Sequence, residues 1–493
     1  MRALRFVSTL SLVTATALPA FAGGGYFSGT KGARAAGRGG AFTAKADDLS
    51  AVAFNPAGLA HIGTTLIQVG NRFSYNSHSY TRAPTLDWGG AQDSGGIPRY
   101  VEFDEVDNGE PWQLLDPLLG ITTNFGLKDW QFALAAYAPA GVSKEEYPVE
   151  GGQRYMMVSR EAQILNYSLS AAWKLRELFG VGASLQWIAV PKLKYSLIID
   201  GDPFDGAGGN GVSSDYDIHA TTEGKDFFTF NAVIGGWYRP APFLELGLSA
   251  QVVPADITTS STLSVQPLDP DTVRGGITLR RGTEEANDVD VSFPLPMTFR
   301  AGARYRHLDG EKELFDVELD LTYETWSRVD QFSLDSRGLV AYVQENPVNV
   351  GNIMIDKQWQ DTLTVALGGD FNVVPERFTA RAGVYFETAV ADDAYANIDF
   401  AGGNFTGFAL GGSAFFDKFE IALAYEFRGM STVSVSEGDA RVYVEAPGSL
   451  CTEPYTDPDA CNAAYLGQPG PVVNAGTYDA YSHMASLDVL YRF

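Results

Sequence analysis

The chain has 493 residues, of which 53 are glycine, and its aromatic fraction of 12% stands beside a charged fraction of only 19%. A soluble protein of this length usually carries more charge, whereas a barrel with a polar interior and an apolar exterior averages to such values, so the composition favours an all-β fold. The formal net charge of −25 argues against nucleic acids and anionic lipid surfaces as partners, because both require a basic surface.

Residues 1–22 are predicted to be a cleaved signal peptide. Two arginines precede an apolar run over residues 6–18, and an Ala-Phe-Ala sequence at 20–22 has the small residues that signal peptidase requires. We expect the mature chain to begin at Gly23. The apolar run is too short to span a bilayer, and no later stretch of eighteen apolar residues follows it, so helical membrane spans are excluded.

Residues 23–63 precede the first expected strand and are too rich in glycine, alanine and apolar residues for a free tail. Asn55 is predicted to cap a short helix in which Pro56 takes the first position and Ala57 follows, because the missing N–H of proline costs nothing there. The lumen of a barrel of fourteen strands is wide enough to hold such a compact segment.

From residue 64 to residue 493, segments alternate apolar and polar residues with the period of a β-strand. In the last one, Leu487, Val489 and Phe493 share one face and Asp488 lies on the other. A soluble sandwich also alternates in this way, with its apolar face turned inward. The pattern predicts strands at 64–75, 114–127, 130–142, 161–175, 180–199, 225–239, 243–253, 291–306, 314–329, 361–374, 377–388, 406–417, 419–430 and 480–493.

Two observations favour a transmembrane antiparallel barrel of about fourteen strands over the sandwich. The first is a ladder of opposed charges on one face of a hairpin, which suits a polar lumen and contains Arg300, Arg304, Arg306, Asp316, Glu318 and Asp320. The second is the alternation of long and short connections along the chain, which is typical of barrels with long loops on one rim and tight turns on the other. Closure also leaves no open sheet edge in lipid.

Four segments resemble the FadL-type long-chain fatty acid transporters, a family that includes porters for aromatic hydrocarbons. They cover nearly the whole mature chain: GTKGARAAGRGGAFTAKADDLSAVAFNPAGLA at 29–60, NYSLSAAWKLRELFGVGASLQWI at 166–188, FPLPMTFRAGARY at 293–305 with DVELDLTYETWS at 316–327, and DTLTVALGGDF at 361–371. The resemblance implies a monomeric barrel in the bacterial outer membrane, surrounded by its lipids and lipopolysaccharide, with residues 23–63 as a hatch in the lumen.

The resemblance also implies that hydrophobic ligands enter from outside and leave sideways through a kink in the third strand. In this chain the kink would lie at Pro139, Ala140 and Gly141, since proline removes a ladder hydrogen bond and glycine tolerates irregular backbone. The alternative is that Pro139 only ends the strand. For the carboxylate of a fatty acid, the candidate partners are cations expected to face the lumen: Lys192, Lys194, Arg300 and Arg304.

No other chemistry is indicated. Cys451 and Cys461 lie in a loop rich in proline, glycine and aspartate, where a local disulfide is favoured over a metal site. The five histidines have no metal-ligand spacing, and we predict neither a catalytic residue nor a cofactor. The predicted function is passive transport of hydrophobic molecules, with a water-filled porin or an adhesin as alternatives.

Overall fold

In the computed structural model, residues 31–86, 100–139, 142–199, 212, 217–271, 276–310, 312–343, 346–349, 353–400, 402–444 and 471–493 are described. Strands dominate this part of the chain, and the helical elements have three to six residues each: α1 (Ala33–Ala36), α2 (Ala51–Phe54), η1 (Pro56–His61), η2 (Trp326–Arg328) and η3 (Asp393–Tyr395). Among the described residues, no helix is both long and apolar enough to cross a membrane.

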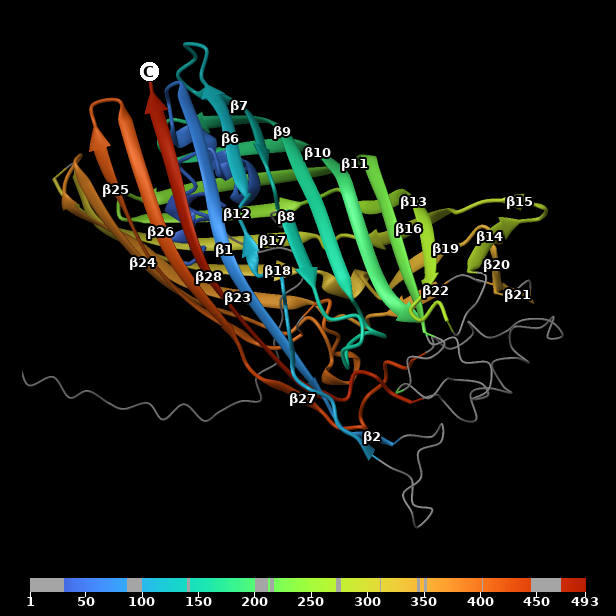
Figure 1. The fold of residues 1–493 in the computed structure, drawn as a ribbon. Helices are drawn as coiled ribbons and strands as arrows, with labels where there is room; N and C mark the ends of the chain where they lie inside the picture. The colour runs from blue at the N-terminus through green and yellow to red at the C-terminus, as the bar shows by residue number, and fades with distance from the viewer. Residues whose placement is uncertain are drawn as a thin grey trace, which may run out of the picture.

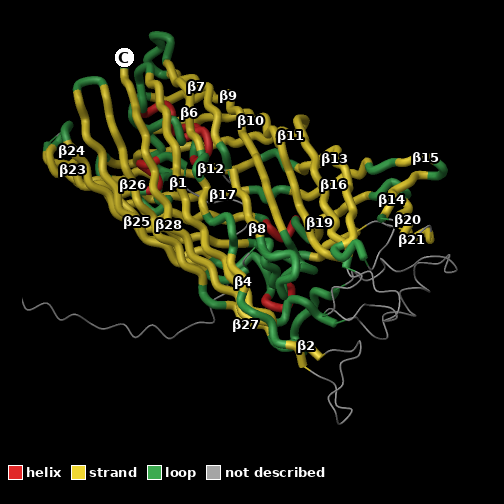
Figure 2. Tube along the Cα trace, viewed as in Figure 1, coloured by secondary structure: helices red, strands yellow, loops and turns green. Residues whose placement is uncertain are grey.

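Fourteen antiparallel strands close into a barrel, as predicted (Figures 1 and 2). Each strand pairs with the next along the chain, and the last pairs with the first. In order they are β1 (Leu66–Arg82), β6 (Pro117–Thr123), β7 (Trp130–Tyr137), β9 (Ser159–Leu175), β10 (Phe179–Ile199), β11 (Ile218–Ala241), β12 (Leu244–Gln251), β17 (Thr298–Asp309), β18 (Lys312–Glu324), β23 (Thr362–Val374), β24 (Phe378–Glu387), β25 (Phe405–Phe416), β26 (Phe419–Met430) and β28 (Gly476–Arg492).

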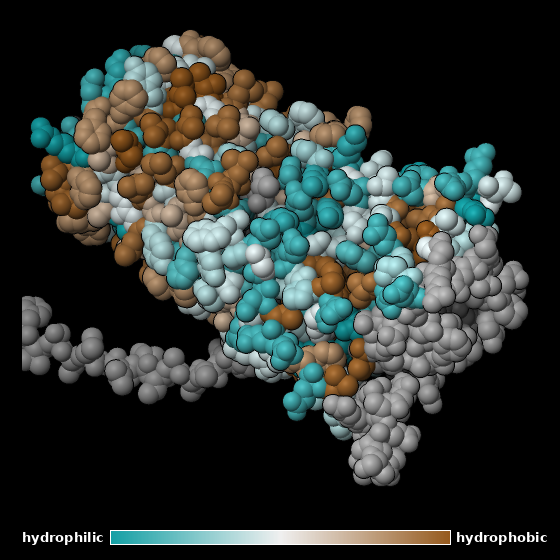
Figure 3. All heavy atoms as spheres, viewed as in Figure 1, coloured by the Kyte–Doolittle hydropathy of each residue, from teal (hydrophilic) through white to brown (hydrophobic). Residues whose placement is uncertain are grey.

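The alternating sequence places polar side chains inside the barrel and apolar ones outside. On β26, Glu420 and Glu426 are buried in the interior, whereas Ile421 and Leu423 point outward and Leu423 is 57% exposed. Such exposure of large apolar residues suits contact with lipid. Figure 3 shows apolar residues gathered around the part of the barrel that carries the chain's C-terminus, while polar residues predominate, with smaller apolar patches, on the rest of the visible face.

The two rims differ as the sequence predicts. Short turns join the strands at the short-turn rim, where the C-terminus lies, and the longer segments cross at the opposite long-loop rim (Figure 1). The long-loop segments add further strands: β2 (Thr85–Leu86), β3 (Tyr100–Val101), β4 (Val106–Asp107), β5 (Trp112–Gln113), β8 (Val142–Glu146), β13 (Asp256–Pro267), β14 (Ile277–Arg281), β15 (Glu284–Glu285), β16 (Asp288–Pro294), β19 (Gln331–Asp335), β20 (Val340–Val343), β21 (Asn346–Asn349), β22 (Ile353–Asp356) and β27 (Val433–Val435).

Residues 31–63 form a compact body inside the barrel, near the short-turn rim, and we call this body the hatch (Figure 1). Its apolar side chains pack on one another and on the inner face of β6, β7 and β9. Phe42 and Phe54 meet edge to face with ring centroids 5.8 Å apart. The predicted signal peptide and Gly23 lie outside the described residues, so that prediction stays open.

Candidate functional site

A buried charge cluster fixes the middle of the hatch to the barrel wall. The Arg38 guanidinium donates to Asp316 Oδ1 and Asp370 Oδ1, each at 2.6 Å, and to Glu318 Oε2 at 2.9 Å. Lys45 adds a second cation, whose Nζ lies 2.6 Å from Asp316 Oδ2. Because a buried carboxylate without a cation is costly, hatch and wall neutralise each other.

The same wall carboxylates also bind the hatch backbone. Asp320 Oδ2 accepts from the backbone N–H of Phe42 and of Thr43, each at 2.8 Å, and Glu318 Oε1 accepts from Ala44 N–H at 2.6 Å. These amides belong to a turn without a regular helix or strand, so they would otherwise be buried without partners. The acidic face of the predicted hairpin therefore serves as a socket for the hatch.

Glycines in the wall allow the hatch backbone to approach closely. A Cβ added to Gly368 would lie 2.0 Å from the Arg38 carbonyl oxygen, and one added to Gly383 would lie 2.1 Å from the same atom. On β10, a Cβ at Gly182 would lie 2.5 Å from Ala57 N. Any larger residue at these positions would push the hatch away from the wall.

Asn55 caps the short helix as predicted. Its Oδ1 accepts from Ala57 N–H at 3.2 Å, and Pro56 occupies the first helical position. The Asn55 amide nitrogen also donates to Thr43 O within the hatch and to Gly236 O on β11, at 2.9 and 3.1 Å. The cap residue thus joins the C-terminal end of the hatch to the wall as well as starting the helix.

Burial perturbs the pKa of two charged groups of the hatch, Lys31 at its start and Asp47 at its middle. Burial lowers the pKa of Lys31 to about 8, although its partner Asp116, with Oδ1 at 2.9 Å, opposes the shift. For Asp47, burial raises the pKa, but the attraction of Arg34 and then of Lys45 outweighs burial and lowers it to about 2. The folded protein therefore favours the ionised form of Asp47, whereas it disfavours the charged form of Lys31.

A cavity of about 220 Å³ lies between the hatch and the long loops, and we call it the loop-side cavity. Most of its wall is apolar and comes from β9, β10, β11 and the added strands at the long-loop rim. The apolar lining comprises Ala162, Ile164, Leu193, Tyr195, Leu197, Ile199, Ala220, Leu263, Val291, Phe293, Phe332, Leu334, Ile355, Phe400, Phe405 and Met484. A wall of this kind suits a hydrocarbon.

Two arginines on the lining of the loop-side cavity lie over aromatic rings. The Arg160 guanidinium is 4.3 Å from the Phe400 ring centroid and binds Glu145 at 2.7 Å. The Arg428 guanidinium is 3.6 Å from the Phe405 ring centroid and binds Glu387 at 3.2 Å. Glu145 lines the cavity with Arg160, whereas Glu387 does not line it, so the cavity wall contains Arg428 without its carboxylate partner.

Lys192 and Lys194 lie on the outer face of β10, so the prediction that they face the lumen is wrong. The pairing of β10 with β11 shifts register between Ile188 and Leu193, and this β-bulge exchanges the two faces of the strand. Below the bulge Ile188 points inward, and above it Leu193 lines the loop-side cavity. Lys192 binds Glu161 of the neighbouring strand at 2.8 Å.

Arg300 and Arg304 do face the interior, but both serve the hatch region. Arg304 is buried and binds Glu245 Oε2 and Asp316 Oδ2, each at 2.9 Å. Arg300 donates to the carbonyl oxygen of Ala53 in the hatch at 3.3 Å. Neither residue lines the loop-side cavity, and their role as ligand partners stays a prediction.

The wall is interrupted at Pro139. Pairing of β7 with β9 ends at Tyr137 opposite Asn166, and β8 resumes it at Val142 opposite Gln163. Between these two paired positions, the chain from β7 to β8 has four residues, 138–141, whereas β9 has only two, 164–165. Ala140 and Gly141 lie outside the described residues, whereas Pro139 and Tyr137 line a pocket of about 90 Å³ that also touches Ala53 of the hatch, here called the hatch-side pocket.

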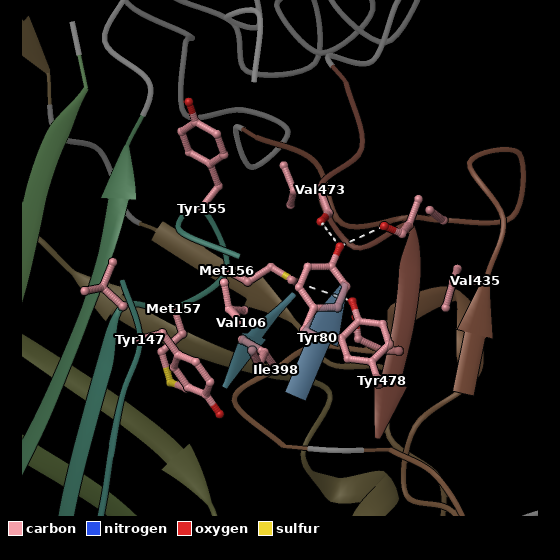
Figure 4. Packing of buried hydrophobic residues seen from close by; sticks show 14 of the residues in the cluster. Tyr80, Val106, Tyr147, Tyr155, Met156, Met157, Ile398, Val435, Val473 and Tyr478 are labelled. Carbon is pink, nitrogen blue, oxygen red and sulfur yellow. Dashed lines mark hydrogen bonds between the residues drawn. The ribbon is translucent and has the colours of Figure 1, made fainter. Parts of the chain in front are cut away.

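A hydrophobic cluster joins the long loops beside the loop-side cavity (Figure 4). Tyr80 and Tyr478 lie side by side with ring centroids 4.5 Å apart, and the Tyr80 hydroxyl donates to the carbonyl oxygens of Val473 and Ala475 at 2.7 and 2.8 Å. Tyr195 connects this cluster to the cavity, because it lines the cavity and donates to Met156 O at 2.7 Å. Cys451 and Cys461 lie outside the described residues.

The family model described as outer membrane protein transport protein (OMPP1/FadL/TodX) matches residues 13–452. The chain belongs to this FadL/TodX family. Members of the family are outer-membrane transporters of hydrophobic compounds. Among the described residues, no group of histidine, cysteine, aspartate and glutamate is arranged to hold a metal ion.

Solved structures of the FadL/TodX type share the fold. A Pseudomonas aeruginosa FadL homologue aligns with a TM-score of 0.71 and 16% identity, over 95% of this chain and 100% of that one. The Pseudomonas putida toluene transporter TodX gives 0.60 and 15%, over 94% and 99%, and the Ralstonia pickettii toluene transporter TbuX gives 0.56 and 14%, over the same shares. No curated protein sequence matches the chain.

Proposed function

We propose that this protein carries long-chain fatty acids through the outer membrane by diffusion, without any bond chemistry. The observation that supports this choice of ligand is the pairing of an apolar wall with Arg428 in one cavity. A hydrocarbon chain would lie along the apolar lining, and its carboxylate would bind the guanidinium of Arg428. An aromatic hydrocarbon would use the lining but would have no use for the cation.

The route that we propose turns sideways above the hatch. Ile164 lines both the loop-side cavity and the hatch-side pocket, so the two are neighbours. From the hatch-side pocket the ligand would pass the interruption at Pro139 into the membrane. The hatch would rearrange at Ala53, which lies in this pocket, while Arg38 remains bound to the wall.

The choice of ligand is tested by replacing Arg428 with methionine and measuring binding of oleate and of a neutral alkane by native mass spectrometry. We expect oleate to bind about tenfold more weakly, and the alkane to bind as before, since an ion pair contributes only to the acid. Lys194→Met on the outer face is the matched control and should change neither affinity. An equal loss for both ligands would disprove the role of Arg428.

The lateral route is tested by making the third strand regular. Deletion of Pro139 and Ala140 leaves two residues against two and preserves the inward direction of the flanking side chains. We expect the deletion variant to fold and to bind oleate, but fatty acid uptake by cells to fall to the level without the protein. Unchanged uptake would refute sideways release.

A water-filled porin is disfavoured because the hatch occupies the lumen. Recording in planar bilayers separates the two functions: a porin gives a large steady ion conductance, whereas the proposed transporter gives none. An adhesin or structural barrel predicts that fatty acid uptake is the same with and without the gene.

A further inference from the structure

The outer face of the barrel carries an apolar groove of about 470 Å³ between β6, β7, β9, β10 and β11. Its lining is almost wholly apolar, and it lies on the face that the fold turns toward lipid. The groove is lined by Leu119, Gly120, Ile121, Leu134, Ala135, Ala136, Tyr167, Ser168, Leu169, Leu185, Trp187 and Phe230. We call it the lipid-side groove.

A single small side chain creates this groove. Ala136 points outward from β7, and the outward residues around it are large, for example Leu119 opposite it on β6 and Tyr167 opposite it on β9. The rim is firmly positioned, because Trp187 lies against Tyr167 with ring centroids 5.1 Å apart and its Nε1 donates to Phe227 O at 2.8 Å. The depression is thus built into the wall.

The groove adjoins the interruption of the wall at Pro139. The last pair of residues between β7 and β9 is Tyr137 with Asn166. Ala136 and Tyr167, which line the groove, form the pair next to it. Tyr137 and Asn166 line the hatch-side pocket on the inside. The hatch-side pocket and the lipid-side groove therefore lie on the two sides of the same strand pair, directly beside the place where its hydrogen bonds stop.

We propose that the lipid-side groove is a docking site for the hydrocarbon chain of the transported ligand after it has passed Pro139. This inference rests on the function proposed above. At this depth an occupant has to be apolar, because the groove offers almost no hydrogen-bonding partner. Because the groove lies next to the interruption, we choose the ligand that emerges there as the occupant, and not a lipid that arrives from elsewhere in the bilayer. Docking would keep the ligand from returning to the lumen.

The experiment uses the full-length protein in lipid nanodiscs and dibrominated stearate, whose bromine atoms quench tryptophan fluorescence on contact. The quenching of Trp187 is obtained as the difference in fluorescence between the native protein and Trp187→Phe. Trp130, which is exposed on the same outer wall near the short-turn rim, is read in the same way through Trp130→Phe. Trp326 and Trp359 lie beside Phe332 and Phe400 and report on the loop-side cavity.

We expect quenching of Trp187 to saturate with increasing stearate, whereas quenching of Trp130 rises in proportion to the stearate dissolved in the bilayer. Ala136→Leu fills the groove and should weaken the saturable phase about tenfold, which corresponds to about 1.4 kcal/mol. Ala382→Leu, which adds the same side chain to the outer face of β24, should leave it unchanged.

Each other outcome overturns the proposal in a distinguishable way. Linear quenching of Trp187, with saturable quenching of Trp326 and Trp359, would exclude the groove and retain the proposed function. Absence of saturable quenching at every tryptophan would exclude the function as well. Saturable quenching of Trp187 by a dibrominated phosphatidylcholine, and not by the stearate, would assign the groove to a membrane lipid.

Discussion

The half of the barrel interior near the short turns holds buried ion pairs, whereas the half near the long loops holds an apolar cavity. In the first half, the hatch supplies Arg38 and Lys45 to the wall carboxylates. In the second half, loops and added strands turn apolar residues such as Phe332 and Phe400 inward. The wall strands run through both halves, but they present carboxylates to the hatch in the first half and apolar residues of β9, β10 and β11 to the cavity in the second.

This difference shows that one wall can serve two purposes at different heights. A buried ion pair has a strict geometry and is costly to break, so it suits a plug that must stay in one position. Apolar contacts are not directional, so they suit ligands of varied length. The predictions below separate the two halves by asking which substitutions change stability and which change ligand affinity.

The largest effect is expected for Arg38→Met, which leaves three buried carboxylates without their shared cation. We expect a loss of about 3 to 5 kcal/mol in the free energy of unfolding, with oleate affinity of the folded fraction nearly unchanged. Thermal unfolding in detergent, followed by circular dichroism, measures the loss. Arg337→Met, which removes an exposed cation that binds Asp288 and Asp290, is the control and should leave the unfolding temperature unchanged. Equal effects of the two variants would show that the cluster does not hold the hatch.

Gly368→Ala is expected to destabilise the hatch half next, by about 3 kcal/mol, because its Cβ would lie 2.0 Å from the Arg38 carbonyl oxygen. Gly236→Ala is the matched control, since its Cβ would lie 3.5 Å from the nearest atom. Proteolysis of hatch peptides, followed by mass spectrometry, should detect a loosened hatch in the first variant and not in the second. If the hatch peptides resist proteolysis in both variants, the wall at Gly368 can move enough to accept the added methyl group.

Lys31 gives the hatch half a pH dependence. Its pKa is lowered from 10.5 to about 8, so between these values the unfolded chain binds more protons than the folded one. Stability contributed by this group therefore rises with pH across that window, by roughly 3 kcal/mol. The difference in unfolding temperature between the native protein and Lys31→Met should change across the window. A constant difference would contradict the lowered pKa.

The smallest effect on stability is expected in the other half. Leu197→Ala enlarges the loop-side cavity and should weaken oleate binding by about 1 kcal/mol through lost apolar contact, with little change in the unfolding temperature. Leu410→Ala, on the lipid-facing side of β25, is the control for oleate binding. If Leu197→Ala lowers stability as strongly as Gly368→Ala does, the two halves are not energetically distinct.

The barrel could be predicted from the sequence because alternation of period two and the lengths of the connections are local signals. The opposed charges of the hairpin could also be predicted from the sequence: Arg304 lies opposite Glu318 and Arg306 opposite Asp316, as expected. What the pattern did not reveal is that these carboxylates bind the hatch. Their partner Arg38 lies about 280 residues earlier in the chain, and nothing local indicates the contact.

The candidate ligand residues were predicted less well, and for one physical reason. A β-bulge in β10 reverses the face on which each later residue lies, so extending the alternation from Ile188 placed Lys192 and Lys194 inside. The inward direction of Arg160 could have been predicted from the same alternation, because β9 has no bulge between Arg160 and Asn166. Arg428 likewise shares a face with Glu426 on β26.

The closing seam of the barrel has a consequence for its assembly. β28 pairs with β1 along its whole length, and Asp488 on β28 accepts from Ala33 N–H of the hatch at 2.8 Å. The hatch precedes β1 in the chain, yet the wall around it is complete only after β28 has been added. Closure of the seam therefore completes the wall site that holds Ala33, so formation of the ring and seating of the hatch stabilise each other.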